Sequence, residues 1–556
     1  MQAIYNIAEI CARHNIKDAV LSPGSRCAPL TLAFVRHSKI RAITITDERS
    51  AAFIAMGKAM VNKKASVLLC TSGTAALNYG PAIAESYYQQ IPLLILTADR
   101  PPEWIDQQDG QTIRQDNIFG RHVKKSYTLP ADHNNTDAQW QIERIVSEAI
   151  LAAHEYPQGP VHINIPLREP LYSAQEIVFD KTVKVIEKIE AQPILSPELL
   201  QQLKNELSTY TKILLVSGQT DASEELKTNV GSFIHSNTIP LVADVITNLQ
   251  DLPSAITQHD IFLPVCNQEE LKPELLITFG KSVISKNLKQ FLRKHKPVAH
   301  WHIQEAGEVA DTFQSLTRII PVKPEYLLKA LVNVTDTSNY YEHWKKVDDK
   351  SRELKESYFN AANIHNEFSC FYHLIKMLPN NSLIHLANSM PVRYANLIGI
   401  TERSGVKVFA NRGTSGIDGV ISTAYGTALA SSDPVIVFTG DLSFFYDRNA
   451  FWNNYRPANL KVIVFNNHGG GIFRIIDGPN KQPELDEYFE TKQPLNAKSL
   501  ANEYGINYYS CTSLNELAIA KDFLNDQQTA ILEIETDSKT NADFFCRFKE
   551  FMKEKF

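Results

Sequence analysis

A carboxylate and an amide close two successive apolar segments in the C-terminal third of this chain. The segment PVIVFTG is followed directly by Asp441, and the segment LKVIVFNN ends at Asn467. Asn467 comes 26 positions after Asp441, which suits one strand–helix–strand step. Neighbouring parallel strands end at the same edge of a sheet, so the two side chains are expected to lie together. Carboxylate, amide and carbonyl oxygens suit Mg²⁺ holding substrate phosphates, so the spacing indicates a magnesium–diphosphate site.

Helix capping is a competing explanation for any single polar residue at a strand end. Ser, Thr, Asp and Asn are preferred N-caps and need no ligand to explain them. The Gly73 turn and the glycines at 469–471 also suit simple tight turns. The chain has no GxxxxGK[ST] loop and no GxGxxG fingerprint, so an ATPase or an ordinary NAD enzyme lacks support.

Short apolar segments alternate with helical patterns along nearly all of the 556 residues. This alternation predicts an α/β protein with parallel sheets, and the length requires several domains. We expect three doubly wound parallel-sheet domains, at 1–180, 190–350 and 358–556, with an irregular linker around 170–195. The expected strands are 18–23, 41–46, 65–71, 91–97, 159–166, 212–218, 239–244, 275–280, 297–303, 382–388, 406–412, 434–440, 460–467 and 529–535.

Charge and composition narrow the class of protein. The net charge of −6 argues against a dedicated nucleic-acid binder. The seven cysteines are scattered without a CxxC pair, as is typical of reduced thiols. The sequence has no apolar run near the ~18 residues of a membrane span and no signal-peptide pattern at its start. We therefore expect a cytoplasmic protein without a membrane span.

Arginines gather at the predicted strand ends of this acidic chain. Arg26, Arg100 and Arg412 each follow an expected strand, and Arg393 lies shortly after another. Any one of them could be a solvated surface residue. Four at the ligand-binding edge favour a substrate with several carboxylates, which guanidinium groups bind in a bidentate manner.

The pattern G-D-x(~25)-N-N in this context resembles the thiamine diphosphate (ThDP) enzymes. Such enzymes carry pyrimidine-binding, central and diphosphate-binding domains in that order, as expected here. The motifs SPGSRCAPL, DERSAAFIAMGKA, CTSGTAALN, LTADRPPE, GQTIRQ, GPVHINIPLREPL, NRGTSGIDG and FNNHGGGIF resemble one family more closely. That family is 2-succinyl-5-enolpyruvyl-6-hydroxy-3-cyclohexene-1-carboxylate (SEPHCHC) synthase. The resemblance covers both terminal domains and is weak in the central one.

The resemblance implies a role for individual residues. Asp441, Asn467 and the Gly469 carbonyl would bind Mg²⁺ or Mn²⁺. Glu48 would hydrogen-bond the aminopyrimidine of ThDP, although an acid in the first turn of a helix is also a common surface residue. Ile417 would be the apolar wedge under the bent cofactor. Ser389 and Ser443 would also contact the cofactor, and Arg393 and Arg412 would join Glu48 in catalysis. The substrate-pocket positions are Ser25, Arg26, Arg100, Gln111, Lys286, Ser389, Arg393, Arg412 and Phe473.

The implied reaction joins 2-oxoglutarate to isochorismate. 2-Oxoglutarate would lose CO₂ on ThDP and the remaining four-carbon unit would add to the isochorismate ring, in menaquinone biosynthesis. The family shares each active site between subunits, which implies a homodimer or homotetramer. One departure is visible, because Asn287 stands where the family usually has a basic residue after Lys286. Two alternatives remain. One is an acetolactate-synthase-like decarboxylase or carboligase, and the other is a non-catalytic protein of the same fold.

Overall fold

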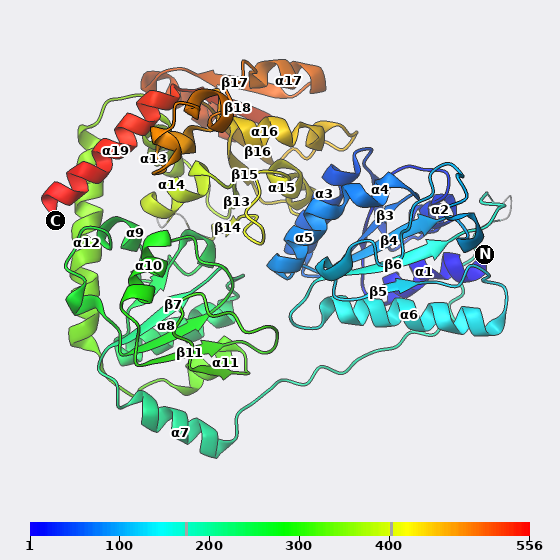
Figure 1. Cartoon of the computed structure of the whole chain (residues 1–556), viewed down its shortest axis with the longest axis horizontal. Helices are drawn as coiled ribbons and strands as arrows, with labels where there is room; N and C mark the ends of the chain where they lie inside the picture. Colours follow the sequence, from blue (N-terminus) through cyan, green and yellow to red (C-terminus); the bar gives the residue numbers. More distant parts are fainter. Residues whose placement is uncertain (173–175, 401–403) are drawn as a thin grey trace.

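The computed structural model describes residues 1–172, 176–400 and 404–556 and contains three β-sheets. Each sheet has six strands, and the strand pairings are parallel throughout. In Figure 1 the first sheet and its helices lie at the right in blue and cyan. The central sheet lies at the lower left in green, and the third at the upper left in yellow to red. The expected α/β class with three parallel sheets is confirmed.

The first sheet has the strand order β2-β1-β3-β4-β6-β5. Its inner strands are fully buried apolar runs, because helices cover both faces. The strands are β1 Asp18–Leu21, β2 Arg41–Thr44, β3 Ser66–Cys70, β4 Leu93–Asp99, β5 Ser126–Thr128 and β6 Pro160–Pro166. The helices are α1 Gln2–Arg13, α2 Ala28–Arg36, α3 Glu48–Asn62, α4 Thr74–Asn78, α5 Gly80–Gln89 and α6 Thr136–His154.

Residues 74–89 of the first domain form two short helices. The segment TAALNYGPAIAESYYQQ divides into α4 and α5, which meet at Tyr79. Pro81 lacks a backbone N–H and stands in the first turn of α5, where that loss is tolerated. The chain therefore restarts a helix here instead of continuing one.

The central sheet has the order β12-β11-β10-β7-β8-β9. Its strands are β7 Ile213–Ser217, β8 Leu241–Ala243, β9 Ala255–Ile256, β10 Leu275–Phe279, β11 Ala299–Ile303 and β12 Arg318–Ile320. Its helices are α7 Pro197–Leu207, α8 Glu224–Asn237, α9 His259–Phe262, α10 Lys286–Lys294 and α11 Pro324–Ala330. The long helix α12, Ser338–Ala361, then runs beside the central domain toward the third one (Figure 1).

The third sheet, β14-β13-β15-β16-β18-β17, has the same strand order as the first when each is counted from its own first strand. Its strands are β13 Leu383–Leu386, β14 Lys407–Phe409, β15 Val435–Gly440, β16 Leu460–Asn466, β17 Asn507–Cys511 and β18 Ala530–Glu535. Its helices are α13 Glu367–Ile375, α14 Met390–Ile398, α15 Val420–Ala430, α16 Asp441–Tyr446, α17 Ala497–Tyr504, α18 Ala520–Asn525 and α19 Ser538–Lys555.

The sequence analysis missed four strands, and all four lie at a sheet edge: β5, β9, β12 and β17. An edge strand is covered on fewer sides than an inner one, so its sequence need not be a continuous apolar run. The β5 segment SYT and the β17 segment NYYSC contain mostly polar or half-exposed residues. The fourteen expected strands are all present, with ends that differ by at most three residues.

The expected linker carries no helix or strand over its described parts, 170–172 and 176–195. Residues 173–175 of it lie outside the described residues. The carbonyls of Val178 and Val183 accept hydrogen bonds from Gln2 and Arg13 of α1, at 2.7 and 2.6 Å. The Ile186 N–H donates to Ser147 of α6. The segment therefore follows the first domain before it crosses to α7 (Figure 1).

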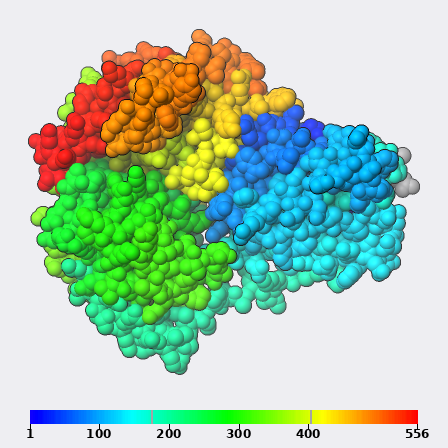
Figure 2. All heavy atoms as spheres, viewed as in Figure 1, coloured from blue at the N-terminus to red at the C-terminus, as the bar shows by residue number. Residues whose placement is uncertain are grey.

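Helices α3 and α15 join the first and third domains by direct backbone contact. A Cβ atom on Gly57 would lie 2.0 Å from the Thr423 carbonyl oxygen, and one on Gly426 would lie 2.0 Å from that of Ile54. Only glycine permits this approach, since real Cβ contacts are never that short. Figure 2 shows the three domains meeting near the middle of the visible face. No helix in the described part of the chain is long and apolar enough to cross a membrane.

Candidate active site

Asp441 and Asn467 follow two neighbouring strands, β15 and β16. These strands are paired with Gly440 opposite Phe465, so both ends lie at one edge of the third sheet. The Gln493 amide donates to Asp441 Oδ2 at 2.8 Å and to Asn466 Oδ1 at 3.3 Å, which ties the two ends together. Capping does not explain Asp441, because Gly440 holds the N-cap position of α16.

Two buried carboxylates lie at this edge without a basic partner. Burial raises the pKa of Asp441 to about 6, against a smaller lowering by the Gln493 hydrogen bond. Burial likewise raises the pKa of Glu367 to about 7, opposed by its bond from Asn467 and reinforced by the Asp441 charge. Among the ion pairs of the described residues, no lysine or arginine pairs with either acid. A bound divalent cation would compensate this charge.

The donor set fits a hard cation of the magnesium type. Within residues 1–172, 176–400 and 404–556, no cluster of three or more His, Cys, Asp or Glu side chains is placed to hold a metal ion. The candidate site differs from such clusters, because it offers one carboxylate, one amide and one backbone carbonyl. Asn467 Nδ2 donates to Glu367 at 2.5 Å, and Asn467 Oδ1 accepts from the Gly469 N–H at 3.1 Å. Mg²⁺ uses few protein carboxylates and takes its other ligands from water and phosphates.

An apolar side chain stands exposed on the loop that precedes α15. Ile417 is 41% exposed, although it is large and aliphatic. The Ser443 hydroxyl, from α16, donates to the Ile417 carbonyl at 2.5 Å. Gly419 has a φ of 77°, and a Cβ there would lie 2.4 Å from the Phe53 ring. The loop is therefore fixed from both sides while its isoleucine stays available for a ligand.

Arg393 and Arg412 form the cationic part of the third-domain site. The Arg412 NH1 group donates to Asn388 Oδ1 at 2.8 Å, but its Nε is buried without a hydrogen-bond partner in the structure. Burial lowers the pKa of Arg412, and the Arg393 charge lowers it further. Arg393 donates to the Ser389 carbonyl, and Ser389 has a φ of 74°. An unpaired guanidinium nitrogen and a strained serine are typical of a ligand site.

The loop after Arg412 is held by the first domain. Glu85, buried on α5, accepts from the Gly413 N–H at 2.8 Å and from the Thr414 N–H and hydroxyl, both at 2.6 Å. Its fourth bond comes from Gln89 at 2.6 Å. A charged buried residue is tolerated when its oxygens are fully hydrogen-bonded. Glu85 therefore sets the position of the loop that carries Arg412.

Glu48 is the first residue of α3. The preceding Asp47 is the N-cap and accepts from the Arg49 and Ser50 N–H groups at 2.9 and 3.3 Å, so capping does explain Asp47. Burial raises the pKa of the Glu48 carboxyl, with a smaller increase from the Asp47 charge and an opposing hydrogen bond from its own backbone. A carboxyl group with this shift can hold a proton closer to neutral pH than an exposed one.

The other predicted first-domain residues lie near the carboxyl ends of its strands. Arg26 is buried and donates to the Leu167 carbonyl at 3.0 Å, and its pKa is lowered by burial and by the Arg100 charge. Arg100 pairs with Asp109 at 3.4 Å. Ser25 lies 3.4 Å from the Tyr172 hydroxyl. A Cβ atom on Gly73 would lie 3.5 Å from the Cα atom of Gln111.

The predicted residues thus fall into two groups on one chain. The first-domain group is Ser25, Arg26, Glu48, Arg100 and Gln111. The third-domain group is Ser389, Arg393, Arg412, Ile417, Asp441, Ser443, Asn467, Gly469 and Phe473, the last in contact with the Phe489 ring at 5.8 Å. Among the described residues, no hydrogen bond or ion pair joins the two groups. Lys286 belongs to neither and is exposed at the start of α10.

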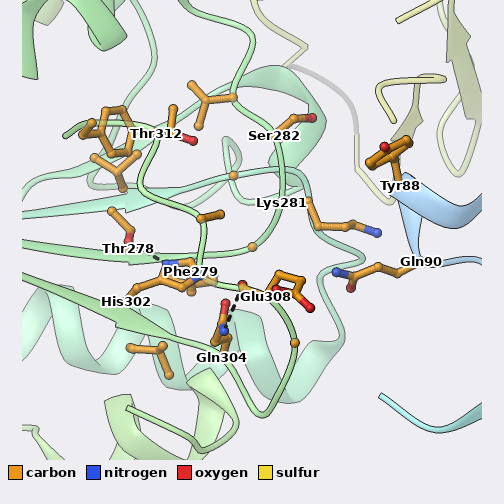
Figure 3. Close-up of a pocket in the computed structure, with 18 of the residues that line it drawn as sticks. Tyr88, Gln90, Thr278, Phe279, Lys281, Ser282, His302, Gln304, Glu308 and Thr312 are labelled. Carbon is orange, nitrogen blue, oxygen red and sulfur yellow. Dashed lines mark hydrogen bonds between the residues drawn. The ribbon is translucent and has the colours of Figure 1, made fainter. Parts of the chain in front are cut away.

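A separate cavity of about 250 Å³ lies between the first and central domains. Tyr88 and Gln90 approach it from the first domain, opposite Lys281, as Figure 3 shows. The Lys281 ammonium donates to the Gln89 carbonyl at 2.6 Å. None of the predicted site residues lines this cavity. A more open hollow of about 730 Å³ does include Asn467, together with Arg474 and Gln493.

Three residues of the site were not found in the sequence: Glu85, Glu367 and Gln493. Glu367 and Gln493 form hydrogen bonds with the predicted residues Asn467 and Asp441. Glu85 instead bonds Gly413 and Thr414, which directly follow the predicted Arg412. Glu367 follows the N-cap Asn366, so its sequence context is that of an ordinary first-turn acid. The burial that makes it unusual exists only after the third domain has folded.

Family profiles cover most of the chain. "Thiamine pyrophosphate enzyme, N-terminal TPP binding domain" matches residues 1–118, "Middle domain of thiamine pyrophosphate" matches 196–386, and "Thiamine pyrophosphate enzyme, C-terminal TPP binding domain" matches 395–534. A solved benzoylformate decarboxylase from Polynucleobacter necessarius shares the fold, with a TM-score of 0.73, 16% identity and coverage of 97% of this chain and 99% of that one. The matched family profiles show that the chain is a ThDP-dependent enzyme.

Curated relatives narrow this class to one family. The chain is 48% identical to the SEPHCHC synthase of Cytophaga hutchinsonii, over 100% of both chains. It is 39% identical to the SEPHCHC synthase of Flavobacterium johnsoniae and 39% identical to that of Flavobacterium psychrophilum, each over 96% of both chains. The chain belongs to the SEPHCHC synthase family.

Proposed function

We propose that the protein is a SEPHCHC synthase. It decarboxylates 2-oxoglutarate with ThDP and joins the four-carbon product to isochorismate by 1,4-addition, in menaquinone biosynthesis. The observation that carries this proposal is the 48% identity along the whole chain to an enzyme of that name. The arginines at the strand ends support it, since each of the two substrates carries two carboxylates.

The third domain would hold the diphosphate end of the cofactor. Asp441, Asn467 and the Gly469 carbonyl would bind Mg²⁺ or Mn²⁺, and Ser389 and Ser443 would lie against the cofactor. Ile417, already exposed, would support the bent form from below. Bound ThDP supplies a nucleophilic carbon and an electron sink for decarboxylation. The chain supplies the metal ligands, the shape and the charge around that carbon.

Glu48 would bind the aminopyrimidine end. Its raised pKa favours a carboxyl group that shares a proton with a ring nitrogen near neutral pH. With ThDP bound, a proton shared by Glu48 would keep the cofactor's own amino group available as a base. Asp47 caps α3 and so keeps the Glu48 carboxyl at the helix start.

The substrate carboxylates would be bound by the two arginine groups. Arg393 and Arg412 lie on the third domain, with the free Nε of Arg412 as a donor, and also act in catalysis. Arg26, Arg100, Ser25 and Gln111 would contribute from the first domain, with Lys286 and Phe473 completing the pocket. Arg412 is partly buried, and a guanidinium bonds a carboxylate more strongly away from bulk water.

Each complete active site would combine two subunits. Within one chain the Glu48 group and the Asp441 group share no hydrogen bond or ion pair among the described residues. A second subunit would bring a Glu48 group against each diphosphate site, so we propose a homodimer or homotetramer acting in the cytoplasm. Activity that persists in a demonstrably monomeric protein would contradict this assembly.

One assay tests the proposed reaction. The purified protein is incubated with ThDP, Mg²⁺, 2-oxoglutarate and isochorismate, and CO₂ and the coupled product are measured with each component omitted in turn. We expect product only when all are present, and no product from pyruvate in place of 2-oxoglutarate. Turnover of pyruvate would instead favour the acetolactate-synthase-like alternative.

A further inference from the structure

The 469–493 loop, which begins at the glycines of the proposed metal site, folds back on itself. The Gly470 N–H donates to the Glu490 carbonyl at 2.5 Å, and the Gln493 N–H donates to the His468 carbonyl at 3.0 Å. Both ends of the loop therefore meet where β16 ends. The loop contains three short helices, η6 Gly471–Arg474, η7 Pro479–Lys481 and η8 Leu485–Phe489.

A buried ion pair joins the two halves of this loop. Arg474 Nε donates to Glu490 Oε1 at 3.0 Å and Arg474 Nη2 donates to Glu490 Oε2, so the guanidinium holds the carboxylate in a bidentate manner. The Glu490 side chain is 1% exposed. Among the ion pairs of the described residues, Arg474 is the cation that pairs with Glu490. Removal of either partner would leave a buried charge uncompensated, so the pair holds the two halves together.

The backbone of Glu490 lies directly against the metal-site glycines. A Cβ atom on Gly469 would lie 2.8 Å from the Glu490 carbonyl oxygen, and one on Gly470 would lie 3.3 Å from it. The Gly469 carbonyl accepts from the Gly471 N–H at 3.1 Å and keeps a second lone pair for a ligand. Displacement of Glu490 would therefore move the carbonyl that we propose as a metal ligand.

The same loop end carries the amide that holds Asp441. Gln493 comes three positions after Glu490, and its side-chain amide donates to Asp441 Oδ2 at 2.8 Å. Arg474 in turn fixes the loop to the start of α19, because its Nε donates to the Ser538 hydroxyl at 3.1 Å. The hollow of about 730 Å³ that includes Asn467 is also lined by Arg474, Gln493 and Ser538. The ion pair thus borders the proposed metal site without using any of its ligands.

We infer that the Arg474–Glu490 pair positions the Gly469 carbonyl and the Gln493 amide for the metal ion. This inference rests on the proposed function, because it requires the proposed Mg²⁺ site. Both residues act through the backbone of the 469–493 loop, so they are positioning residues. Ligands that are held in place before the ion arrives bind it more tightly, and residues that orient metal ligands usually change metal affinity 10–100-fold.

The test measures the affinity for Mg²⁺ in Glu490→Gln, Arg474→Gln, the double variant and Lys481→Met. Lys481 is the control, because it is a 74% exposed cation of the same loop and pairs with Asp477 at 3.6 Å. Mg²⁺ is titrated calorimetrically with ThDP present, below the unfolding temperature of every variant. We expect a dissociation constant at least about tenfold higher in both single variants and unchanged within threefold in Lys481→Met. The double variant should lose no more than threefold beyond the larger single effect, since the two residues act as a pair.

A milder variant and one rescue separate positioning from loss of the fold. Arg474→Lys keeps the charge but lacks the planar fork, so Mg²⁺ binding should weaken about threefold to tenfold. At saturating Mg²⁺ the kcat of each folded variant should return to within threefold of the wild type, which general damage to the structure would not allow.

Two outcomes would overturn the inference. One is a Mg²⁺ dissociation constant within threefold of the wild type in both Arg474→Gln and Arg474→Lys. The other is a kcat that stays low in the folded variants at saturating Mg²⁺. If the wild-type protein binds no ThDP in the presence of Mg²⁺, the proposed cofactor site fails instead, and that result is separate.

Discussion

Glu85 and Thr414 lie 329 positions apart in sequence and are joined by two hydrogen bonds, from the Thr414 N–H and hydroxyl to one Glu85 oxygen. The bonds connect the first domain to the loop that follows Arg412. The position of Arg412, which we propose to bind substrate, thus depends on a residue of another domain. Glu85 is therefore expected to affect substrate binding without touching the substrate.

Substitution of Glu85 should weaken substrate binding through this loop. Glu85→Gln replaces one acceptor oxygen by a donor, which leaves an N–H of Gly413 or Thr414 without its partner. An unmade buried hydrogen bond costs about 1–3 kcal/mol. We expect the KM of at least one substrate to rise about tenfold, measured at saturation of the other. Thr414→Val removes one bond alone and should have a smaller effect; an equal or larger one would contradict this role.

Glu48→Gln should separate cofactor binding from turnover. The amide keeps the size of the side chain but cannot share a proton with the pyrimidine, so kcat should fall at least 100-fold. The affinity for ThDP, measured by calorimetry with Mg²⁺ present, should change by less than about tenfold. Asp47→Ala is an informative comparison, because it removes the helix cap and should lower stability by about 1 kcal/mol. Near-normal turnover in Glu48→Gln would rule out the assignment.

Asp441→Ala should abolish metal-dependent binding of ThDP. The loss of the carboxylate removes the only charged ligand of the proposed site, so we expect ThDP affinity to fall at least 100-fold at any Mg²⁺ concentration. Glu367→Gln should reduce the apparent Mg²⁺ affinity by about 10–100-fold, as is usual for a residue that orients a metal ligand. The affinities of both variants for ThDP and Mg²⁺ are measured by calorimetric titration. The release of ThDP on treatment with a chelator is measured in parallel. Retention of chelator-sensitive ThDP binding in Asp441→Ala would refute the site.

Gly57→Ala should destabilise the contact between α3 and α15. The new methyl group would lie 2.0 Å from the Thr423 carbonyl oxygen, so one helix must move. Overpacking of this kind costs typically about 1–3 kcal/mol. Gly231→Ala, inside α8, is the control, since its Cβ meets only Leu252 at 3.7 Å and should stabilise that helix by about 0.5–1 kcal/mol. Denaturant unfolding measures both, and a Gly57→Ala protein as stable as the wild type would contradict the crossing.

Lys355 should give stability a measurable pH dependence. It is buried on α12, donates to Gln258 at 2.9 Å and to the Ile398 carbonyl at 2.5 Å, and burial lowers its pKa to about 8. Between the folded pKa of about 8 and the unfolded value of 10.5, only the unfolded chain holds the proton. Stability therefore rises with pH across that window. From pH 8 to 9.5 the wild type should gain about 1–2 kcal/mol relative to Lys355→Met in urea unfolding.

The inner strands were predictable because a strand buried on both faces must be an apolar run. The strand-end residues were predictable because polar side chains directly follow those runs. Asp441, Asn467, Arg26 and Arg100 were found in this way. Glu85 and Glu367 were not, since their importance comes from burial between distant segments. Asn287 was noticed as a departure, but its bond to the Asp260 carbonyl depends on the fold and could not be read from the sequence.

The backbone contact between α3 and α15 is reciprocal. Each glycine meets the carbonyl of the residue three positions before the other glycine, Gly57 with Thr423 and Gly426 with Ile54. The two helices also hold equivalent places, each following the second strand, β2 or β14, of sheets with the same strand order. The chain therefore contains an internal pseudo-twofold axis, an isologous interface between two unlike halves. The scaffold is symmetric and its chemistry is not: α3 begins with the acid Glu48, whereas α15 is preceded by Gly419, which has no side chain to offer.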